Sequence, residues 1–191
     1  MTTHPTTALA TGIRTWLTNR GLDPDEPNLA DTPARVERAW TELTSGYEQD
    51  PEAVLERTFP VDRSDGMIAV TGVPFTSMCA HHLMPFTGTA TIAYLPVAGA
   101  PVVGLSKLPR LLDVYAHRLQ AQEQLTHQVT EALDLFLKTE GSACIVRAEH
   151  GCMTQRGIRK PGAAMVTTAV TGPFAADPEL RAQLWDLHRG G

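Results

Sequence analysis

Three residues of this sequence have the types and spacing of metal ligands. Cys79 and His82 lie three positions apart in the segment SMCAHHLMPF, so a single turn can direct both side chains at one ion. A further thiol, Cys152, follows His150 by two positions in the segment EHGCMTQRGIRK. Catalytic zinc commonly has three protein ligands, with Cys2His among the known sets, and keeps a fourth position for water. The spacing therefore predicts a catalytic zinc site formed by Cys79, His82 and Cys152.

Other interpretations of these residues stay open at this point. No Asp, Glu, Lys or Arg occurs between Gly66 and Ser106, and histidines and cysteines in apolar surroundings are usually satisfied core residues. A structural zinc ion is another alternative, although structural sites usually have four Cys or His ligands in paired short spacings. Cys144 is a poor ligand candidate, because six strand residues place it ~20 Å from His150 at ~3.3 Å per residue. We interpret it as a small buried hydrophobic residue.

Basic residues gather beside these motifs, although the net charge of the chain is −5. They are Arg35, Arg38, Lys107, Arg110, Arg156, Arg159 and Lys160. Arginine side chains and helix N-termini are the usual means of holding phosphates, whereas any one such residue alone is more often part of a solvated surface. Glu123 lies in the first turn of a predicted helix, and its carboxylate could accept two N–H donors from the edge of a guanine.

Composition describes a globular protein of ordinary domain size. The chain has 191 residues, of which 42% are hydrophobic and 19% are charged, and this balance disfavours disorder. Its negative net charge gives no support for nucleic-acid binding. Three cysteines are too few for a disulfide scaffold and favour a reducing compartment. The sequence shows no secretory signal and no apolar run near the ~18 residues of a membrane helix, so we expect a cytoplasmic protein without a membrane partner.

The pattern of apolar residues predicts an α+β fold. Helices are predicted at 7–20, 33–46, 106–120, 122–140 and 177–189, with Thr32 and Ser106 as N-caps of the second and third. Segments rich in Val, Ile and Thr predict strands at 67–75, 87–97, 100–105, 142–150 and 163–172. The order of strand pair, two helices and strand pair predicts helices packed on one face of an antiparallel sheet. We place an N-terminal helical segment at 1–60 and the catalytic domain at 61–191.

Several linked segments together resemble one enzyme family. CAHHLMPF, VVGLSKLPRLLDVYAHRLQAQEQLT and AEHGCMTQRGIRKPGAAMVTT are similar to signature segments of GTP cyclohydrolase I, and LADTPARVERAW resembles the helix that precedes its catalytic domain. The resemblance covers roughly residues 28–174, and linked motifs are far more specific than a single pattern. It implies a tunnelling fold with an antiparallel four-stranded sheet and two helices on one face. It also implies zinc and a homodecamer with active sites between subunits.

The resemblance further implies roles for individual residues. The zinc ligands would be Cys79, His82 and Cys152. The acid–base histidines would be His81 and His150. Guanine would be anchored by Glu123, helped by Gln122. The ribose and triphosphate would be faced by Ser106, which we group with the catalytic residues, and by Lys107, Arg110, Arg156, Arg35 and Arg38.

The reaction of that family converts GTP and water into 7,8-dihydroneopterin triphosphate and formate, the first step toward folate and other pterin-derived products. C8 of guanine is a poor electrophile, so such an enzyme must supply both a nucleophile and a proton. Zinc lowers the pKa of its bound water to ~7 in favourable sites. A histidine that titrates near neutrality can protonate N7 and draw electrons from C8.

Two residues beside the metal ligands depart from the usual family pattern. Ala80 stands where Glu usually follows the first cysteine, and Gly151 stands where a bulkier residue is usual. Ala80 removes a carboxylate that could orient a histidine. The alternatives are therefore a diverged relative, acting on another purine nucleotide or stopping at a ring-opened product, and a zinc protein that binds GTP without turnover. A tunnelling-fold nitrile reductase fits less well, because its chemistry would leave the three metal ligands without a purpose.

Overall fold

A computed structural model describes residues 7–63 and 66–190. The chain divides into two compact units, Met1–Thr44 and Ser45–Gly191, whereas the sequence placed the boundary after residue 60. Residues 45–60 pack with the larger unit for two reasons. The backbone N–H of Gly46 donates to the carbonyl oxygen of His117 at 2.8 Å, and Leu55 is buried in the larger unit's core. Among the described residues, every helix is too short or too polar to cross a lipid bilayer.

The N-terminal unit contains two helices, α1 (Ala8–Asn19) and α2 (Thr32–Leu43). The Thr7 side chain caps α1 by accepting the backbone N–H of Ala10. The chain leaves α1 through Gly21, whose φ of 75° lies in the left-handed region that glycine adopts at no steric cost. The prediction of Thr32 as N-cap was wrong by one position, because Asp31 takes that place and Thr32 is the first helical residue.

The larger unit is built around one five-stranded sheet in the order β5-β2-β3-β6-β7. Its strands are β2 (Ile68–Cys79), β3 (Pro85–Leu95), β5 (Leu119–Gln120), β6 (Gly141–His150) and β7 (Met165–Val170). The pairs β2–β3, β3–β6 and β6–β7 are antiparallel, and the two-residue strand β5 runs parallel to β2. The short strands β1 (Thr58–Phe59) and β4 (Val102–Val103) form a separate ladder.

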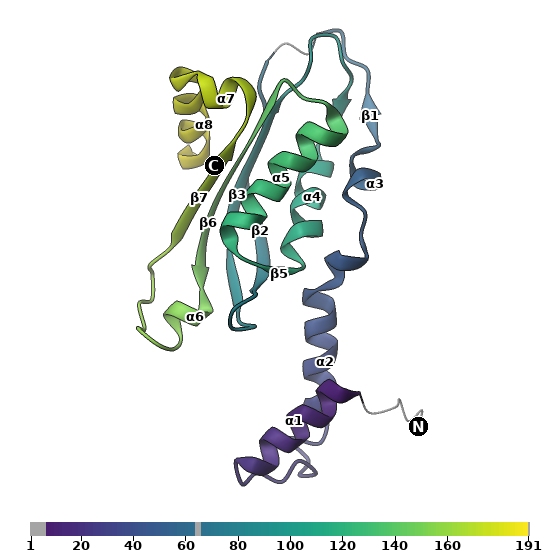
Figure 1. Ribbon diagram of the computed structural model, residues 1–191, viewed down its shortest axis with the longest axis vertical. Helices are drawn as coiled ribbons and strands as arrows, with labels where there is room; N and C mark the ends of the chain where they lie inside the picture. The colour runs from purple at the N-terminus through teal and green to yellow at the C-terminus, as the bar shows by residue number, and fades with distance from the viewer. Residues whose placement is uncertain (1–6, 64–65, 191) are drawn as a thin grey trace. The chain divides into compact units, whose positions relative to one another are not determined.

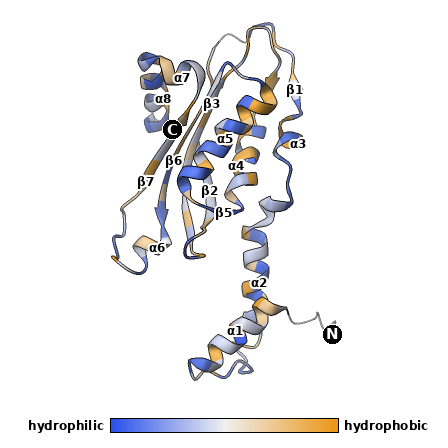
Figure 2. Ribbon diagram, in the orientation of Figure 1, coloured by the Kyte–Doolittle hydropathy of each residue, from blue (hydrophilic) through white to orange (hydrophobic). Residues whose placement is uncertain are grey.

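Helices cover both faces of this sheet (Figure 1). On one face lie α4 (Lys107–Ala116) and α5 (Gln122–Leu137), which pack into a core with Phe86, Ile92 and Val146. On the other lie α7 (Gly172–Ala176) and α8 (Pro178–Gly190), which cover a smaller core around Ile145. Hydrophobic and hydrophilic residues share the surface of α5 (Figure 2), as expected for a helix with one buried side.

Three short helical segments complete the larger unit: η1 (Ser45–Glu48), α3 (Pro51–Leu55) and α6 (Gly151–Thr154). The α+β prediction is confirmed, including the antiparallel four-stranded arrangement of β2, β3, β6 and β7 with two helices on one face. The structure adds β5 as a fifth strand and places the C-terminal helix on the opposite face. A two-residue strand has no sequence signal of its own, because it forms only where β2 is already in place to pair with it.

Candidate metal centre and active site

A tight loop between β2 and β3 presents the first two predicted metal ligands. The loop is closed by backbone hydrogen bonds from the N–H of Cys79 to the carbonyl oxygen of Met84 and from the N–H of Leu83 to that of Cys79, both at 2.9 Å. Leu83 has a φ of 50°, a left-handed conformation that is uncommon outside glycine. This turn directs both Cys79 and His82 to one side, as their spacing predicted.

The third predicted ligand reaches the same point from the far end of β6. This strand ends at His150, and the one-turn helix α6 that follows carries Cys152. The ligand atoms of Cys79, His82 and Cys152 all lie within 4.8 Å of one another, and the Cys79 Sγ and His82 Nδ1 atoms are 3.9 Å apart. Ligand atoms around a tetrahedral zinc ion are about 3.4–3.8 Å apart, given Zn–S and Zn–N bonds of ~2.3 and ~2.0 Å. The three residues therefore fit a zinc ion with little movement.

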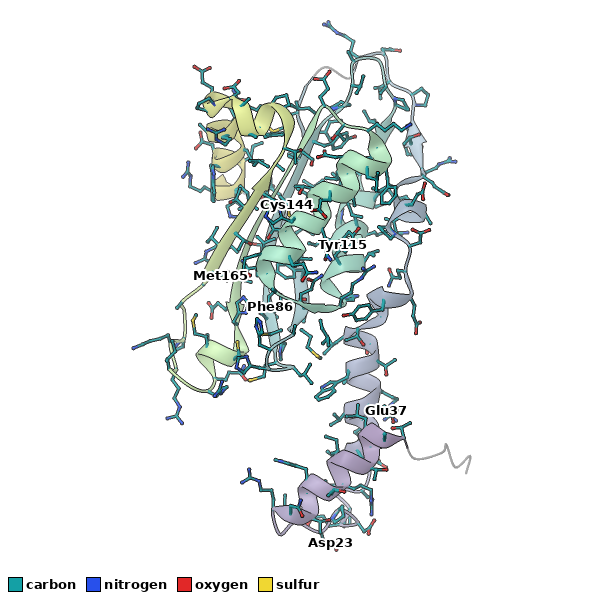
Figure 3. The ribbon with its side chains drawn as sticks, viewed as in Figure 1. Asp23, Glu37, Phe86, Tyr115, Cys144 and Met165 are labelled. Carbon is teal, nitrogen blue, oxygen red and sulfur yellow. The ribbon has the colours of Figure 1, made fainter. Side chains whose placement is uncertain are left out.

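Burial and the adjacent Cys79 thiol raise the pKa of Cys152. A bound cation favours the thiolate form of such a pair and so offsets both effects. Cys144 lies elsewhere on the sheet, farther from the α6 end than Phe86 (Figure 3). It is 0% exposed, and burial raises its pKa to about 12. The prediction of Cys144 as a small buried hydrophobic residue is confirmed.

The imidazole of His150 is held in one orientation by two neighbours. Phe86, which pairs with His150 across β3 and β6, stacks on its ring with 4.4 Å between centroids and 4° between planes. The side-chain oxygen Oε1 of Gln122 lies 2.8 Å from His150 Nε2. Burial lowers the pKa of His150, and the nearby Glu123 carboxylate acts in the opposite direction. His150 is thus fixed beside Cys152 with a pKa below its usual value.

Two departures from the resembling family can be placed in this geometry. A Cβ atom on Gly151 would lie 2.8 Å from the carbonyl oxygen of Pro85, so in this backbone α6 approaches β3 too closely for a larger residue. Ala80 is exposed beside Cys79, and its backbone N–H donates to the carbonyl oxygen of Gln120 at 3.0 Å. That hydrogen bond joins the loop between β2 and β3 to the short strand β5.

His81, the second predicted acid–base residue, is exposed in the same loop. Its Nδ1 atom lies 3.9 Å from the Cys79 Sγ atom, and its ring centre lies 6.4 Å from that of His82. The structure therefore brings His81 to the edge of the metal centre, with its side chain open to solvent.

The predicted substrate-binding residues lie at the starts of two helices and in one loop. Ser106 occupies the N-cap position of α4, as predicted, although its side chain makes no capping hydrogen bond. Lys107 and Arg110 follow in the first turn of that helix. Glu123 is exposed in the first turn of α5, and Arg156 is exposed in the loop after α6. These positions expose cationic groups at one helix N-terminus, where anions are favoured.

Two further predicted residues, Arg35 and Arg38, belong to α2 of the N-terminal unit. Arg35 forms an ion pair with Asp31 at 3.0 Å, on an exposed part of the helix. Their role toward a ligand stays a prediction. Sequence reasoning did not identify Phe86, because nothing in the pattern of an apolar strand distinguishes the one ring that stacks on a histidine of another strand.

Comparison with known proteins then places the chain. The sequence pattern that describes GTP cyclohydrolase I matches residues 9–189. The chain belongs to the GTP cyclohydrolase I family. It is 47% identical to the GTP cyclohydrolase 1 of Corynebacterium glutamicum, over 93% of this chain and 90% of that protein. It is 46% identical to the Mycobacteroides abscessus protein of that name, over 92% and 85%, and 41% identical to the one from Dehalococcoides mccartyi, over 96% and 97%.

Membership of the GTP cyclohydrolase I family confirms the resemblance drawn from the linked motifs. The match extends beyond the predicted 28–174 at both ends, into α1 and α8. The fold agrees with the tunnelling fold that the resemblance implied. The segments that carry the predicted metal ligands and His150 therefore lie inside the region that the family pattern matches.

Proposed function

We propose that this protein is a zinc-dependent GTP cyclohydrolase that converts GTP and water into 7,8-dihydroneopterin triphosphate and formate. One observation carries the proposal: in a chain of the GTP cyclohydrolase I family, the ligand atoms of Cys79, His82 and Cys152 converge within 4.8 Å. Three ligands are the number that catalytic zinc uses when it keeps one position free for water. Zinc in such a site supplies Lewis-acid chemistry and activates water at neutral pH.

In this proposal the two histidines move protons during ring opening. His150 protonates N7 of guanine, which makes C8 more electrophilic toward water. When the C8–N9 bond then breaks, His150 accepts the proton of the hydroxyl group that was added at C8, and N9 takes up a proton from His81. Its stacking on Phe86 and its hydrogen bond to Gln122 support this role, because a proton donor must be held in a fixed position. His81, exposed at the edge of the metal centre, exchanges protons with solvent and with the opened ring.

The remaining predicted residues position the nucleotide. The Glu123 carboxylate accepts N–H donors from the guanine edge. Its side chain is exposed and so accessible to a ligand. Lys107 and Arg110, at the N-terminus of α4, bind triphosphate oxygens together with Arg156. Ser106 faces the ribose from the N-cap position. A firmly held triphosphate keeps the opened intermediate in place while the ribose isomerises and recloses.

We extend the proposal to a homo-oligomer, a decamer by family resemblance, with Arg35 and Arg38 contributing to the triphosphate site. Two open sheet edges support assembly. Within the described residues β7 pairs only with β6, and β2 is paired on its outer side only at Met78 and Cys79. Exposed edges of this kind are normally covered, and a second copy of the chain can cover them. A reducing, cytoplasmic compartment suits three free cysteines, two of which are proposed zinc ligands.

The test combines metal content with product identity. The purified protein should contain about one zinc per chain, and incubation with GTP should release formate and a product with the mass of dihydroneopterin triphosphate. Cys152→Ala should abolish zinc binding and product formation, whereas Cys144→Ala, at a thiol outside the site, should preserve zinc binding and product formation. His150→Ala should abolish turnover and still bind GTP. A zinc-loaded protein that produces neither formate nor pterin would refute the proposal, and a ring-opened product would indicate a diverged relative.

A further inference from the structure

Gln122, the first residue of α5, is buried between that helix and the last two strands of the sheet. Its side chain is only 1% exposed. Its amide nitrogen Nε2 lies 3.1 Å from three acceptors, which are the carbonyl oxygens of Val146 and Met165 and the hydroxyl oxygen of Thr167. A side chain with so little exposure and so many protein partners has no free donor for a ligand.

These contacts fix which way the amide of Gln122 points. Carbonyl oxygens can only accept hydrogen bonds, so the NH2 group must face Val146 and Met165. The oxygen Oε1 must then face His150, whose Nε2 atom lies 2.8 Å away. Because Oε1 can only accept, His150 Nε2 must carry the hydrogen. In neutral His150, the lone pair is therefore on Nδ1.

The His150 ring has no freedom to flip about its Cβ–Cγ bond. Stacking on Phe86, at 4.4 Å between centroids and 4° between planes, holds the ring plane. Phe86 is itself 0% exposed and packs edge-on against Phe75 at 5.9 Å. A flip of the His150 ring would place a carbon opposite Gln122 Oε1 and lose its hydrogen bond.

We propose that Gln122 is a positioning residue that fixes the Nε2–H tautomer of His150 and so leaves Nδ1 as the nitrogen that exchanges protons with guanine. Gln122 acts through His150 and does not contact guanine, which is left to Glu123. The inference rests on the proposed function in one respect, namely that His150 is the acid–base residue. The partner of a histidine's second nitrogen commonly sets its tautomer in this way.

The experiment compares Gln122→Met and Gln122→Glu with a matched control, Thr126→Val. Methionine keeps the length and burial but offers His150 no oxygen, whereas glutamate keeps an acceptor for Nε2–H. Thr126 lies one turn further along α5 and is 1% exposed. Its hydroxyl donates to the backbone carbonyl oxygen of Gln122 at 2.7 Å and accepts from the hydroxyl of Thr167 at 2.6 Å, and neither bond involves the Gln122 side chain or His150. Thr126→Val thus weakens the same contact between α5 and β7 but keeps the hydrogen bond between Gln122 Oε1 and His150 Nε2.

Ring 15N NMR of histidine-labelled protein reads the tautomer directly, with His150→Ala assigning the signal. In the wild-type protein, Nε2 should be protonated and Nδ1 unprotonated. Gln122→Met should give a mixture of tautomers and lower kcat by about 10- to 100-fold, with KM and the Kd for GTP unchanged. This loss is no larger than the low end of the roughly 10²–10⁴-fold that acid–base catalysis contributes, because part of His150 keeps the productive tautomer. Gln122→Glu should restore the tautomer and part of kcat. Thr126→Val should lower Tm but change neither the tautomer nor kcat.

Three results would overturn the inference. One is a wild-type His150 protonated on Nδ1, which needs no variant to fold. Another is Gln122→Met raising the Kd for GTP while kcat stays unchanged, since that marks a guanine contact. The third is Thr126→Val reproducing the NMR change of Gln122→Met, which marks a purely structural effect. A wild-type protein that does not turn over GTP, yet loses the tautomer in Gln122→Met, would refute the proposed function and support the positioning role.

Discussion

The three cysteines of this chain should differ sharply in their reaction with a thiol reagent, because only the thiolate reacts. Burial raises the pKa of Cys144 to about 12. At pH 8 roughly one Cys144 in 10⁴ is then a thiolate, against about a quarter of exposed cysteines with a pKa of ~8.5. The more basic thiolate is also the stronger nucleophile, which reduces this difference in reaction rate by about 30-fold. Cys144 should therefore react roughly 50- to 100-fold more slowly than an exposed cysteine, and exclusion of the reagent from the core slows it further.

The assay is a time course of thiol titration at pH 8, on zinc-loaded protein and after addition of a chelator. With zinc bound, all three thiols should be unreactive. After chelation, the half-buried Cys152 should react first and the more deeply buried Cys79 second. Cys144 should react only when denaturant unfolds the chain. We expect two thiols to become reactive when the chelator is added and the third to become reactive only on unfolding.

Two variants test whether the thiols that become reactive after chelation are the ligands of the bound zinc. Cys144→Ala should leave the two chelator-dependent thiols and the zinc content unchanged. Cys152→Ala should leave Cys79 reactive with or without the chelator, because the metal has lost a ligand. If Cys79 and Cys152 react equally fast before and after chelation in protein that contains zinc, the metal is bound elsewhere and the proposed centre is wrong. If Cys144 reacts rapidly in the folded protein, its burial is wrong.

Three other perturbations follow from the same structure. Phe86→Ala should lower the free energy of unfolding, measured in urea, by about 3–5 kcal/mol because it leaves a cavity in the core. Phe59→Ala, at a ring that is 45% exposed, should lower it by about 0.5 kcal/mol or less. Equal losses would contradict the packing described. Leu83→Val should weaken zinc binding in a metal titration, since β-branched residues disfavour a φ of 50°, and Leu83→Asn should preserve it; the reverse order would exclude a role for the turn. Burial lowers the pKa of His188, which is hydrogen-bonded to Thr91 at 2.9 Å, so the unfolded chain binds the extra proton more readily and stability is lost as pH falls below ~6.5. Replacing it in His188→Gln should flatten Tm between pH 7 and 5, and an unchanged slope would count against this explanation.

Much of the fold could be predicted from the sequence because local patterns carry it. Segments rich in Val, Ile and Thr predicted β2, β3, β6 and β7, because these residues favour strands. The apolar stripe on 122–140 predicted α5, since burial on one face of a helix imposes a period on the sequence. The misplaced features have weak local signals. The N-cap of α2 shifted from Thr32 to Asp31 because both are good cap residues and adjacent. The two-residue strand β5 depends wholly on its partner β2.

The sequence by itself identified Cys79, His82 and Cys152 as candidate metal ligands. Cys79 and His82 are close in the chain, so local backbone geometry brings them together whatever surrounds them, and residue type restricted the third ligand to a distant thiol. Only the tertiary structure showed that Cys152, predicted as the third ligand, reaches Cys79 and His82, that Phe86 stacks on His150, and that Gln122 faces His150 rather than solvent. Those contacts depend on the register of β3 against β6 and on the docking of α5. Both are set by the packing of the whole core, which no local spacing encodes.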